Sequence, residues 1–307
     1  MEKVFISSMN TQTSHQVHGK VLHPQKNNLE KGAHMRRLIE FLLFLPTYLN
    51  KKKLHAQLTG KTIVITGASS GIGKEVAYQL AGIQCHLILV ARRGELLETI
   101  KHTIEKQTTK VSIIQADLRK EDELNNLLAI LHNQPTIDIF INNAGLSIRR
   151  SIYDSLDRYH DFTRTMAINY FAPVKIMLSI IPALQKSQGQ VINVSTVNTR
   201  LAPVPYFAAY QASKSAFDVW LRSVAPELNK DAIASIYLPL VRTPMIEPTE
   251  GYRNTPAMTS HDAAKIICKS MYTRKKKYQP WWLIFGQLVS IFLTNLRDFS
   301  KKGKQND

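Results

Sequence analysis

Thr66-Gly67-Ala68-Ser69-Ser70-Gly71-Ile72-Gly73 is the stretch that decides the fold of this 307-residue chain. It lies between a short β-branched run at 62–66, expected as a strand, and a segment at 74–81, expected as a helix. A glycine-rich turn in this context is typical of sites that bind the pyrophosphate of a dinucleotide. The helix N-terminus then presents free N–H groups to the phosphates. The cofactor contacts expected from this turn are Gly67, Ser69, Ser70, Gly71, Ile72 and Gly73.

The three glycines of this turn have different expected roles. Gly67 permits the tight turn after the strand, and Gly71 lets the backbone approach the pyrophosphate. Gly73 allows the helix and the strand to pack closely. Each role depends on the absence of a side chain, so the pattern predicts geometry as well as a ligand.

Strands and helices alternate along the chain on both sides of this turn. The expected strands are continuous apolar runs, which indicates a parallel sheet buried on both faces. The alternation predicts an α/β fold with a doubly wound parallel sheet, a Rossmann-type single domain. The expected strands are 62–66, 86–90, 111–116, 137–141, 190–194 and 233–238, with a weak candidate near 278–282. The expected helices are 74–81, 95–107, 122–131, stretches within 155–185 broken by Pro173 and Pro182, and 206–229.

Two arginines follow the second expected strand, where an enzyme selective for NAD usually carries an acid. Arg92 and Arg93 suit a 2′-phosphate, because guanidinium groups bind phosphate with paired hydrogen bonds. They predict NADP(H) as the cofactor, and the alternative is a pair of solvated surface side chains. Asp117 follows the third strand and is placed to accept a hydrogen bond from the adenine amino group. The other expected cofactor contacts are Leu118, Asn143, Ala144, Gly145, Tyr210, Lys214, Val241 and Thr243.

Tyr210 and Lys214 are four residues apart on an expected helix, so both side chains project from one face. A phenol has an ordinary pKa of about 10, and a neighbouring ammonium favours the phenolate and lowers that pKa. Lys214 is also expected to hold the ribose hydroxyls of the cofactor. Ser195 ends the fifth strand at the edge where ligands bind, and Asn169 is placed to hold a water beside Lys214. The alternative for the Tyr–Lys pair is an ordinary contact on a helix surface.

These motifs, in this order and spacing, resemble those of the short-chain dehydrogenase/reductase family. The resemblance covers about residues 58–245. It implies that the catalytic Asn–Ser–Tyr–Lys tetrad of the family corresponds to Asn169, Ser195, Tyr210 and Lys214. It also implies hydride transfer with a nicotinamide cofactor, and a homo-oligomer, since the family is commonly dimeric or tetrameric.

A narrower resemblance is to the short bacterial fatty acyl-CoA reductases that form fatty aldehydes for wax esters. The stretches 142–150, 157–162 and 238–249 carry it, together with Leu240, where most of the wider family has glycine. It implies NADPH-dependent reduction of a long-chain fatty acyl-CoA to a fatty aldehyde without an enzyme thiol. Two alternatives stay open: an NADP-dependent carbonyl or hydroxyacyl reductase, and a non-catalytic NADP-binding scaffold.

One segment and three arginines are the candidate contacts for the substrate of such an enzyme. The segment 245–258 is expected to form the lip of an apolar pocket, and its alternative is a plain surface loop. Arg149, Arg150 and Arg242 are expected either to meet the phosphates of coenzyme A or to form structural ion pairs.

The net charge of +17 is concentrated at the two ends of the chain. Residues 1–61 hold ten Lys/Arg against three Asp/Glu, a balance of +7, and residues 274–307 hold eight against two, a balance of +6. Residues 62–273 hold 22 against 18, a balance of only +4. Basic ends that flank apolar runs favour attraction to anionic lipid, whereas a nucleic-acid binder would carry its charge on the folded body. Solubilising tails are the alternative.

The two ends are expected to be appendages of one domain at 58–273. Residues 1–34 are polar and predict a disordered extension, which leaves Met35 as a candidate second start. The basic segment 35–57 is expected to be an amphipathic surface anchor and not a secretion signal, because Glu40 interrupts its apolar run. A protein with such anchors is expected in the cytoplasm, peripheral on the inner face of the cell membrane.

The C-terminal segment 274–307 contains a longer apolar run, 281–296. Its 16 residues are fewer than the roughly 20 that a membrane-spanning helix needs. Gln287, Ser290 and Thr294 form a polar stripe along this expected helix. The pattern favours a helix at the membrane interface, and the alternative is a helix that covers the substrate cleft.

The two cysteines, Cys85 and Cys268, lie in apolar surroundings and are expected to be reduced and buried. No group of cysteines and histidines has the spacing of a metal site, so no metal is expected.

Overall fold

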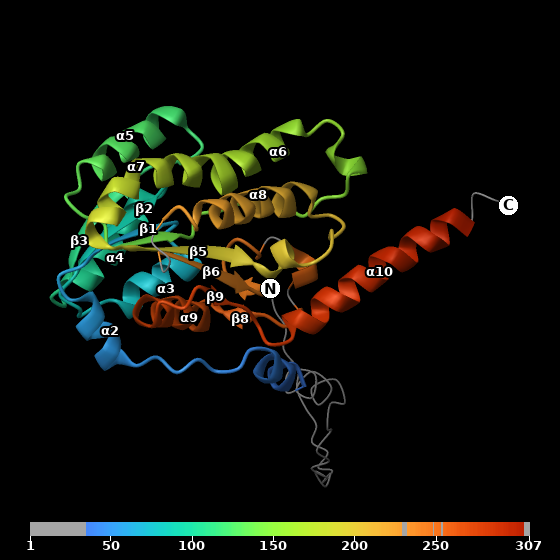
Figure 1. The fold of residues 1–307 in the computed structure, drawn as a ribbon, viewed down its shortest axis with the longest axis horizontal. Helices are drawn as coiled ribbons and strands as arrows, with labels where there is room; N and C mark the ends of the chain where they lie inside the picture. Colours follow the sequence, from blue (N-terminus) through green and yellow to red (C-terminus); the bar gives the residue numbers. More distant parts are fainter. Residues whose placement is uncertain (1–34, 229–231, 248, 253, 304–307) are drawn as a thin grey trace, which may run out of the picture.

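A parallel sheet forms the middle layer of the molecule, with helices on both of its faces (Figure 1). The computed structural model describes residues 35–228, 232–247, 249–252 and 254–303. The expectation of a disordered extension at 1–34 concerns residues outside this described part.

The sheet has seven strands in the order β3-β2-β1-β4-β5-β6-β9, and every neighbouring pair is parallel. The strands are β1 (Thr62–Thr66), β2 (His86–Ala91), β3 (Lys110–Gln115), β4 (Ile139–Asn142), β5 (Gln190–Thr196), β6 (Ile233–Leu238) and β9 (Lys277–Tyr278). The strand order reverses between β1 and β4, as a doubly wound sheet requires. The expected fold class is therefore confirmed, and six strands lie within two residues of their expected bounds.

Helices from several parts of the sequence cover the two faces of the sheet. In the described residues, α-helices include α2 (Lys51–Leu58), α3 (Gly71–Gln79), α4 (Gly94–Glu105), α5 (Glu121–His132), α6 (Tyr159–Met166), α7 (Ala172–Ser187), α8 (Ala208–Val224), α9 (Ser260–Thr273) and α10 (Leu283–Gly303). A further helix covers residues 35–43. The short elements are η1 (Tyr153–Ser155), η2 (Ala167–Phe171), η3 (Val197–Arg200), η4 (Glu250–Tyr252), β7 (Val241–Arg242) and β8 (Met258–Thr259).

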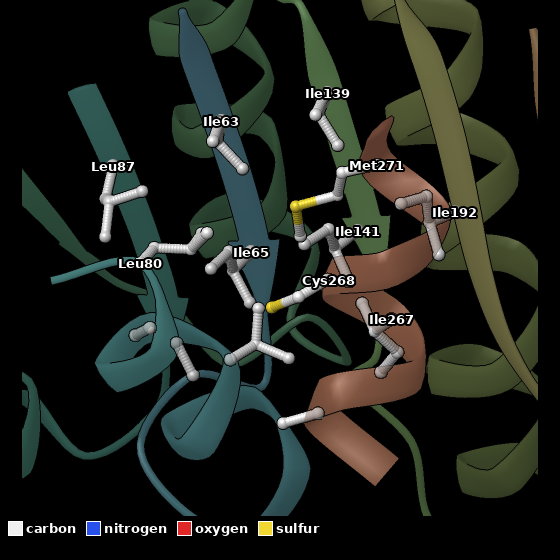
Figure 2. Close-up of a cluster of buried hydrophobic side chains, with 14 of the residues drawn as sticks. Ile63, Ile65, Leu80, Leu87, Ile139, Ile141, Ile192, Ile267, Cys268 and Met271 are labelled. Atoms are coloured by element: carbon white, nitrogen blue, oxygen red, sulfur yellow. The ribbon is translucent and has the colours of Figure 1, made fainter. Parts of the chain in front are cut away.

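The apolar core is divided by the sheet into two clusters. Ile63 and Ile65 of β1 face α2, α3, α4 and α9, whereas Val64 between them faces α5, α7 and α8. Figure 2 shows the first cluster, in which Ile267 and Met271 of α9 lie against the strands. Because both faces of each central strand are covered, these strands are apolar at consecutive positions.

One helical stretch runs without a break from 159 to 187, through α6, the π-helical turn η2 and α7. The expectation that Pro173 and Pro182 break this region is wrong. Pro173 follows directly after the π-helical turn η2, where the regular hydrogen-bond ladder is already interrupted, and Pro182 is flanked by the buried Ile180 and Leu184. In the described residues this stretch alone is long and apolar enough to cross a membrane, but its buried side chains pack on the sheet.

The folded body begins earlier than residue 58. Leu54 and Leu58 of α2 are fully buried in the first core cluster, against α9. Within 35–57, the exposed apolar side chains of the expected anchor lie in the helix at 35–43 and in the linker after it.

Both cysteines are free and buried, as expected. Burial raises the pKa of the Cys85 thiol to about 12 and raises the pKa of Cys268 as well. Thiols with raised pKa values are poor nucleophiles near neutral pH.

The burial of Phe140 predicts a loss of stability when its ring is removed. Phe140 of β4 is fully buried, so Phe140→Ala should lower the free energy of unfolding by ~3–5 kcal/mol through lost burial and a residual cavity. Phe171→Ala, at a ring that is 55% exposed, is the matched control and should cost far less. Denaturant unfolding of the three proteins measures both effects, and equal losses would contradict the assignment of Phe140 to the core.

Candidate active site

A cleft of about 680 Å³ opens at the carboxyl ends of the central strands. Parallel strands all end at the same edge, so side chains from distant parts of the sequence meet there. Most of the expected site residues line this cleft: Gly67, Ser69, Ser70, Gly71, Ile72, Arg92, Arg93, Leu118, Asn143, Ala144, Gly145, Ser195, Tyr210, Lys214, Val241 and Thr243.

The glycine-rich turn has the geometry that its glycines predict. Gly67 and Gly71 have φ angles of +68° and +54°, in the left-handed region that favours glycine. A Cβ on Gly73 would lie 2.5 Å from the Gly67 carbonyl oxygen, so a side chain there would push α3 away from the turn. The Asn143 amide donates to the Thr66 and Gly67 carbonyls at 2.9 and 3.2 Å.

The two arginines after β2 lie beside this turn. Arg93 Nη2 donates to the hydroxyls of Ser69 (3.1 Å) and Ser70 (2.7 Å). Arg92 is largely exposed, and its Nη1 lies 3.8 Å from a carboxylate oxygen of Asp117. Guanidinium and hydroxyl donors therefore gather at one end of the cleft, an arrangement suited to an anionic group.

Three expected site residues do not line the cleft: Gly73, Asp117 and Asn169. The Asp117 carboxylate accepts from Nε and Nη2 of Arg119 at 3.0 and 2.6 Å. The hydrogen bond from Arg119 holds the pKa of Asp117 below its usual range. The carboxylate is therefore already engaged by a neighbour on its own loop.

Tyr210 and Lys214 lie one turn apart on α8, and both line the cleft. Burial raises the pKa of Tyr210 to about 12 and lowers the pKa of Lys214 to about 8. The expected lowering of the Tyr210 pKa is absent, because burial outweighs the hydrogen bond with Thr196, which acts the other way. Lys214 Nζ donates to the Val194 carbonyl at 3.3 Å, which ties α8 to β5 beside Ser195.

Asn169 is buried behind the cleft, in the π-helical turn η2. Its Oδ1 accepts from the Leu146 N–H (3.0 Å), and its Nδ2 donates to the Leu146 carbonyl and to Ser213 Oγ, both at 2.9 Å. A Cβ on Gly145 would lie 3.0 Å from Asn169 Oδ1 and 3.3 Å from Lys214 Nζ. The missing side chain of Gly145 thus leaves space between the two polar groups.

Leu146, Val204 and Phe207 also line the cleft and were not predicted as site residues, whereas Tyr252 was predicted only as part of the segment 245–258. Phe207 is three residues before Tyr210, with ring centroids 6.3 Å apart, so helical spacing alone was a signal for it. Tyr252 belongs to the segment after β7, whose Met245, Ile246 and Thr255 also line the cleft. The segment expected as a lip therefore borders the cleft.

Arg149, Arg150 and Arg242 were expected either to meet coenzyme A phosphates or to form structural ion pairs. Their partners differ in the structure. Arg242 pairs with Glu40, and Arg150 donates to Asp161 at 3.1 Å. Arg149 lies over the Tyr206 ring, 4.9 Å from its centroid. Two of the three are therefore engaged in structural ion pairs.

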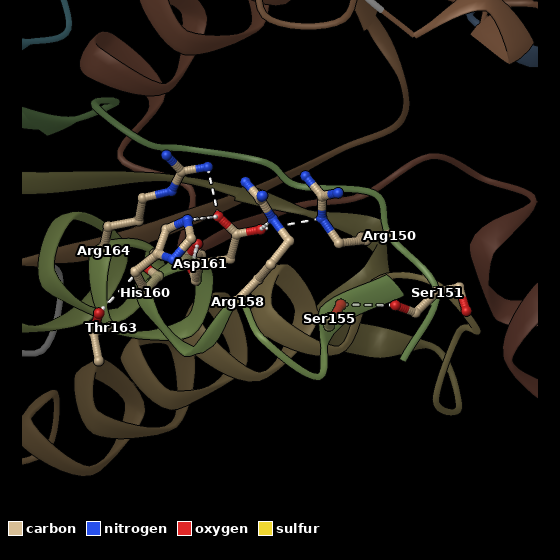
Figure 3. A network of polar contacts seen from close by, with 9 residues as sticks. Arg150, Ser151, Ser155, Arg158, His160, Asp161, Thr163 and Arg164 are labelled. Atoms are coloured by element: carbon tan, nitrogen blue, oxygen red, sulfur yellow. Dashed lines mark hydrogen bonds and ion pairs between the residues drawn. The ribbon is translucent and has the colours of Figure 1, made fainter. Parts of the chain in front are cut away.

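Asp161 is the centre of a cationic cluster on α6 (Figure 3). Burial alone would raise its pKa, but the hydrogen bond from Arg158 and the charges of Arg164 and Arg150 hold the pKa below its usual range. Arg164 Nη2 lies 2.7 Å from Asp161 Oδ1, and Arg158 Nε lies 3.3 Å from Oδ2. Three guanidinium groups around one carboxylate leave this flank of the molecule positive.

Solved structures with the same fold include a short-chain dehydrogenase from Sphingobium yanoikuyae in complex with NADPH, with a TM-score of 0.65 and 23% identity over 80% of this chain and 96% of that chain. A short-chain type dehydrogenase/reductase from Mycobacterium marinum has a TM-score of 0.65 and 22% identity over 74% of this chain and 95% of that one. At these identities the likeness establishes the fold alone.

Two relatives found by sequence are more similar to this chain than these solved structures are. The chain is 42% identical to a fatty acyl-CoA reductase of Acinetobacter baylyi, over 78% of this chain and 83% of that protein. It is 37% identical to a fatty acyl-CoA reductase of Mycobacterium tuberculosis, over 73% and 77% of the two chains. The narrower resemblance expected from the sequence is therefore confirmed. The family described as short chain dehydrogenase matches residues 61–253, and this chain belongs to the short-chain dehydrogenase/reductase family.

Proposed function

We propose that this protein is an NADPH-dependent reductase that converts long-chain fatty acyl-CoA to fatty aldehyde. The observation that carries the proposal is the meeting of Ser195, Tyr210 and Lys214 in one cleft, beside a phosphate-suited end at Arg93. The two relatives named fatty acyl-CoA reductases support the choice of substrate.

The cleft fits a phosphorylated dinucleotide. The backbone of the glycine-rich turn would hold the pyrophosphate at the N-terminus of α3, and Arg93 and Ser70 would hold a 2′-phosphate. A Cβ on Gly71 would meet Thr243 at 2.9 Å, so the turn and the segment after β7 close around the same space. The bound cofactor supplies the hydride.

The chain's own groups would handle the proton and the developing charge. Tyr210 is the proposed proton donor to the thioester oxygen, and its raised pKa keeps the phenol protonated near neutral pH. Ser195 is the proposed second donor to that oxygen. Lys214 would hold the ribose hydroxyls, and the space beside Gly145 suits the water expected between Asn169 and Lys214.

The proposed reaction balances without an enzyme nucleophile. Acyl-CoA, NADPH and one proton give fatty aldehyde, free CoA and NADP⁺, and the C–S bond breaks as the hemithioacetal collapses. Cys85 and Cys268 are buried, have raised thiol pKa values and do not line the cleft. These three facts favour direct hydride transfer over a covalent enzyme thioester.

Apolar side chains just before and after β7 suit an acyl chain. Met245, Ile246 and Leu240 line the cleft near Tyr252. Arg149 is the proposed contact for a phosphate of coenzyme A, since it is exposed and stacked on Tyr206. Such a substrate is an amphiphile, so we include peripheral contact with the inner face of the cell membrane in the proposal.

The substrate assignment predicts a specific product ratio. With palmitoyl-CoA, each NADPH oxidised should release one free thiol and one aldehyde, measured by absorbance, a thiol reagent and gas chromatography. Simple ketones serve as the comparison substrates. Turnover of ketones with no thiol released from palmitoyl-CoA would instead assign the protein to the carbonyl reductases, and no turnover of either would favour the scaffold alternative.

The role of the phenol predicts a separation of binding from chemistry. Tyr210→Phe should lower kcat by about 10²–10⁴-fold, because the proton donor is lost while the ring still fills its place. NADPH binding, followed by fluorescence, should be retained. Tyr78→Phe removes a phenol from α3, where Tyr78 packs on the first core cluster, and should leave kcat unchanged. A Tyr210→Phe enzyme with undiminished kcat would exclude Tyr210 as the donor.

The guanidinium beside the glycine-rich turn predicts the cofactor preference. Arg93→Gln should raise the Kd for NADPH by about 10- to 100-fold, the loss expected for charged hydrogen bonds to phosphate, and change the Kd for NADH little. Lys186→Gln removes one exposed charge at the end of α7, before the opposite edge of the sheet, and is the control. Titration calorimetry measures the four constants, and an equal effect on both cofactors would contradict a 2′-phosphate contact.

A further inference from the structure

The two ends of the described chain meet on one side of the molecule. The indole Nε1 groups of Trp281 and Trp282 donate to the carbonyls of Leu42 (3.1 Å) and Leu43 (3.2 Å). These carbonyls belong to the last turn of the helix at 35–43, where helical carbonyls lack intrahelical partners. In Figure 1 this helix, in dark blue, lies beside the start of α10. Segments 239 residues apart therefore form one surface.

The start of α10 turns its polar side chains toward the protein. Gln287 Nε2 donates to the Arg200 carbonyl at 2.8 Å, and Ser290 Oγ accepts from the Ala202 N–H at 3.2 Å. The first two residues of the polar stripe expected from the sequence thus dock the helix on the segment after β5. A helix on the surface of a water-soluble protein normally presents its polar side to the solvent. In α10, Gln287 and Ser290 face the protein instead.

The outward face of α10 is apolar and has no cover in the described part of the chain. Phe285, Leu288 and Phe292 are 63, 66 and 63% exposed. The helix at 35–43 adds Met35 and Phe41, which are 60 and 58% exposed. Scattered exposed apolar side chains are ordinary, but a contiguous patch of this kind marks an interaction site. We call the exposed apolar side chains of 35–45 and 281–293 the terminal platform.

Exposed cations accompany the two segments of the terminal platform. Arg37 lies in the helix at 35–43 itself, and the exposed lysines 275–277 precede α10. The exposed lysines 51–53 follow the first segment in the sequence but begin α2, at the far end of the linker from that helix (Figure 1). The one acid of the helix at 35–43, Glu40, is turned away and paired with Arg242. An apolar face with a basic border is complementary to an anionic lipid surface. A second copy of the chain would bring the same cations together across a two-fold interface.

The terminal platform is fastened to both walls of the cleft. Glu40 pairs with Arg242 of β7 and accepts from the Ala257 N–H at 3.3 Å, next to Val241, which lines the cleft. On the other side, α10 holds the segment 200–202, just after Asn198, which also lines the cleft. A molecule that leaves a bilayer under the platform would therefore lie near the apolar part of the cleft.

We propose that the terminal platform docks on an anionic bilayer and that the cleft takes its apolar substrate from that bilayer. The docking is independent of the reaction, whereas the source of substrate rests on the proposed function. The helix at 35–43 and α10 act together, because each is held by the other and by one wall of the cleft.

Vesicle flotation of the full chain tests the docking. The protein should float with vesicles that contain phosphatidylglycerol, bind vesicles of phosphatidylcholine alone less, and lose binding as salt is raised. The double variant Phe285→Asp/Phe292→Asp should lower the partition coefficient by about tenfold or more, since each ring loses its burial in lipid. The control, Ile130→Asp/Leu178→Asp, adds the same charge at exposed apolar positions of α5 and α7 and should float like the parent.

Three outcomes would overturn the proposal: no binding by the parent protein, equal loss in the control, or unchanged binding by the platform variant. Light scattering without vesicles adds a fourth outcome that would overturn the proposal. If the parent protein is a dimer and only the platform variant is monomeric, the face binds a second copy of the chain. Circular dichroism and NADPH binding verify that the variants fold. Flotation needs neither cofactor nor substrate, so failure of the reductase assignment leaves its result intact. Conversely, turnover of a soluble short-chain thioester by the platform variant reports on the catalytic groups alone.

Discussion

The hydrogen bonds between Thr66 and the Asn143-Ala144 turn hold the carboxyl ends of β1 and β4 together. Thr66 Oγ1 accepts from the backbone N–H groups of Asn143 and Ala144 at 3.0 and 3.1 Å and donates to the Ile141 carbonyl at 3.2 Å. The Asn143 side chain returns to Thr66 and Gly67. The glycine-rich turn is thereby fixed to β4, and the β4–β5 register pairs Asn142 with Asn193, two residues before Ser195. Both ends of the cleft therefore depend on one short set of polar contacts.

Most of the fold was predictable because burial on both faces leaves a plain trace in a strand. The runs at β1 and β6 are mostly apolar and are buried at every position after the first, and their bounds agree with the expected ones. β9 has only two residues and no such run, so it was a weak candidate. The π-helical turn at Asn169 leaves no periodic signal, and the prolines near it were misleading because tertiary packing holds the helix together.

The site was predictable where a residue's position along a strand or helix determines where it points. Tyr210, Lys214 and Ser195 meet as helical spacing and strand ends require. The pKa of Tyr210 was not predictable, because burial is a tertiary property that the sequence does not record. The engagement of Asp117 by Arg119 depends on local loop geometry two residues away. The far wall of the cleft, with Val204 and Tyr252, comes from loops that have no periodicity to read.

The inward polar face of α10 has a practical consequence for work with this protein. In plain aqueous buffer, Phe285, Leu288 and Phe292, which lie away from the docked Gln287 and Ser290, are largely exposed to water in the described part of the chain. Concentrated solutions should therefore favour weak clustering of molecules through these faces without a fixed stoichiometry, distinct from a defined dimer, and a mild detergent should disperse the clusters. Purification and crystal growth would then proceed best from micelles.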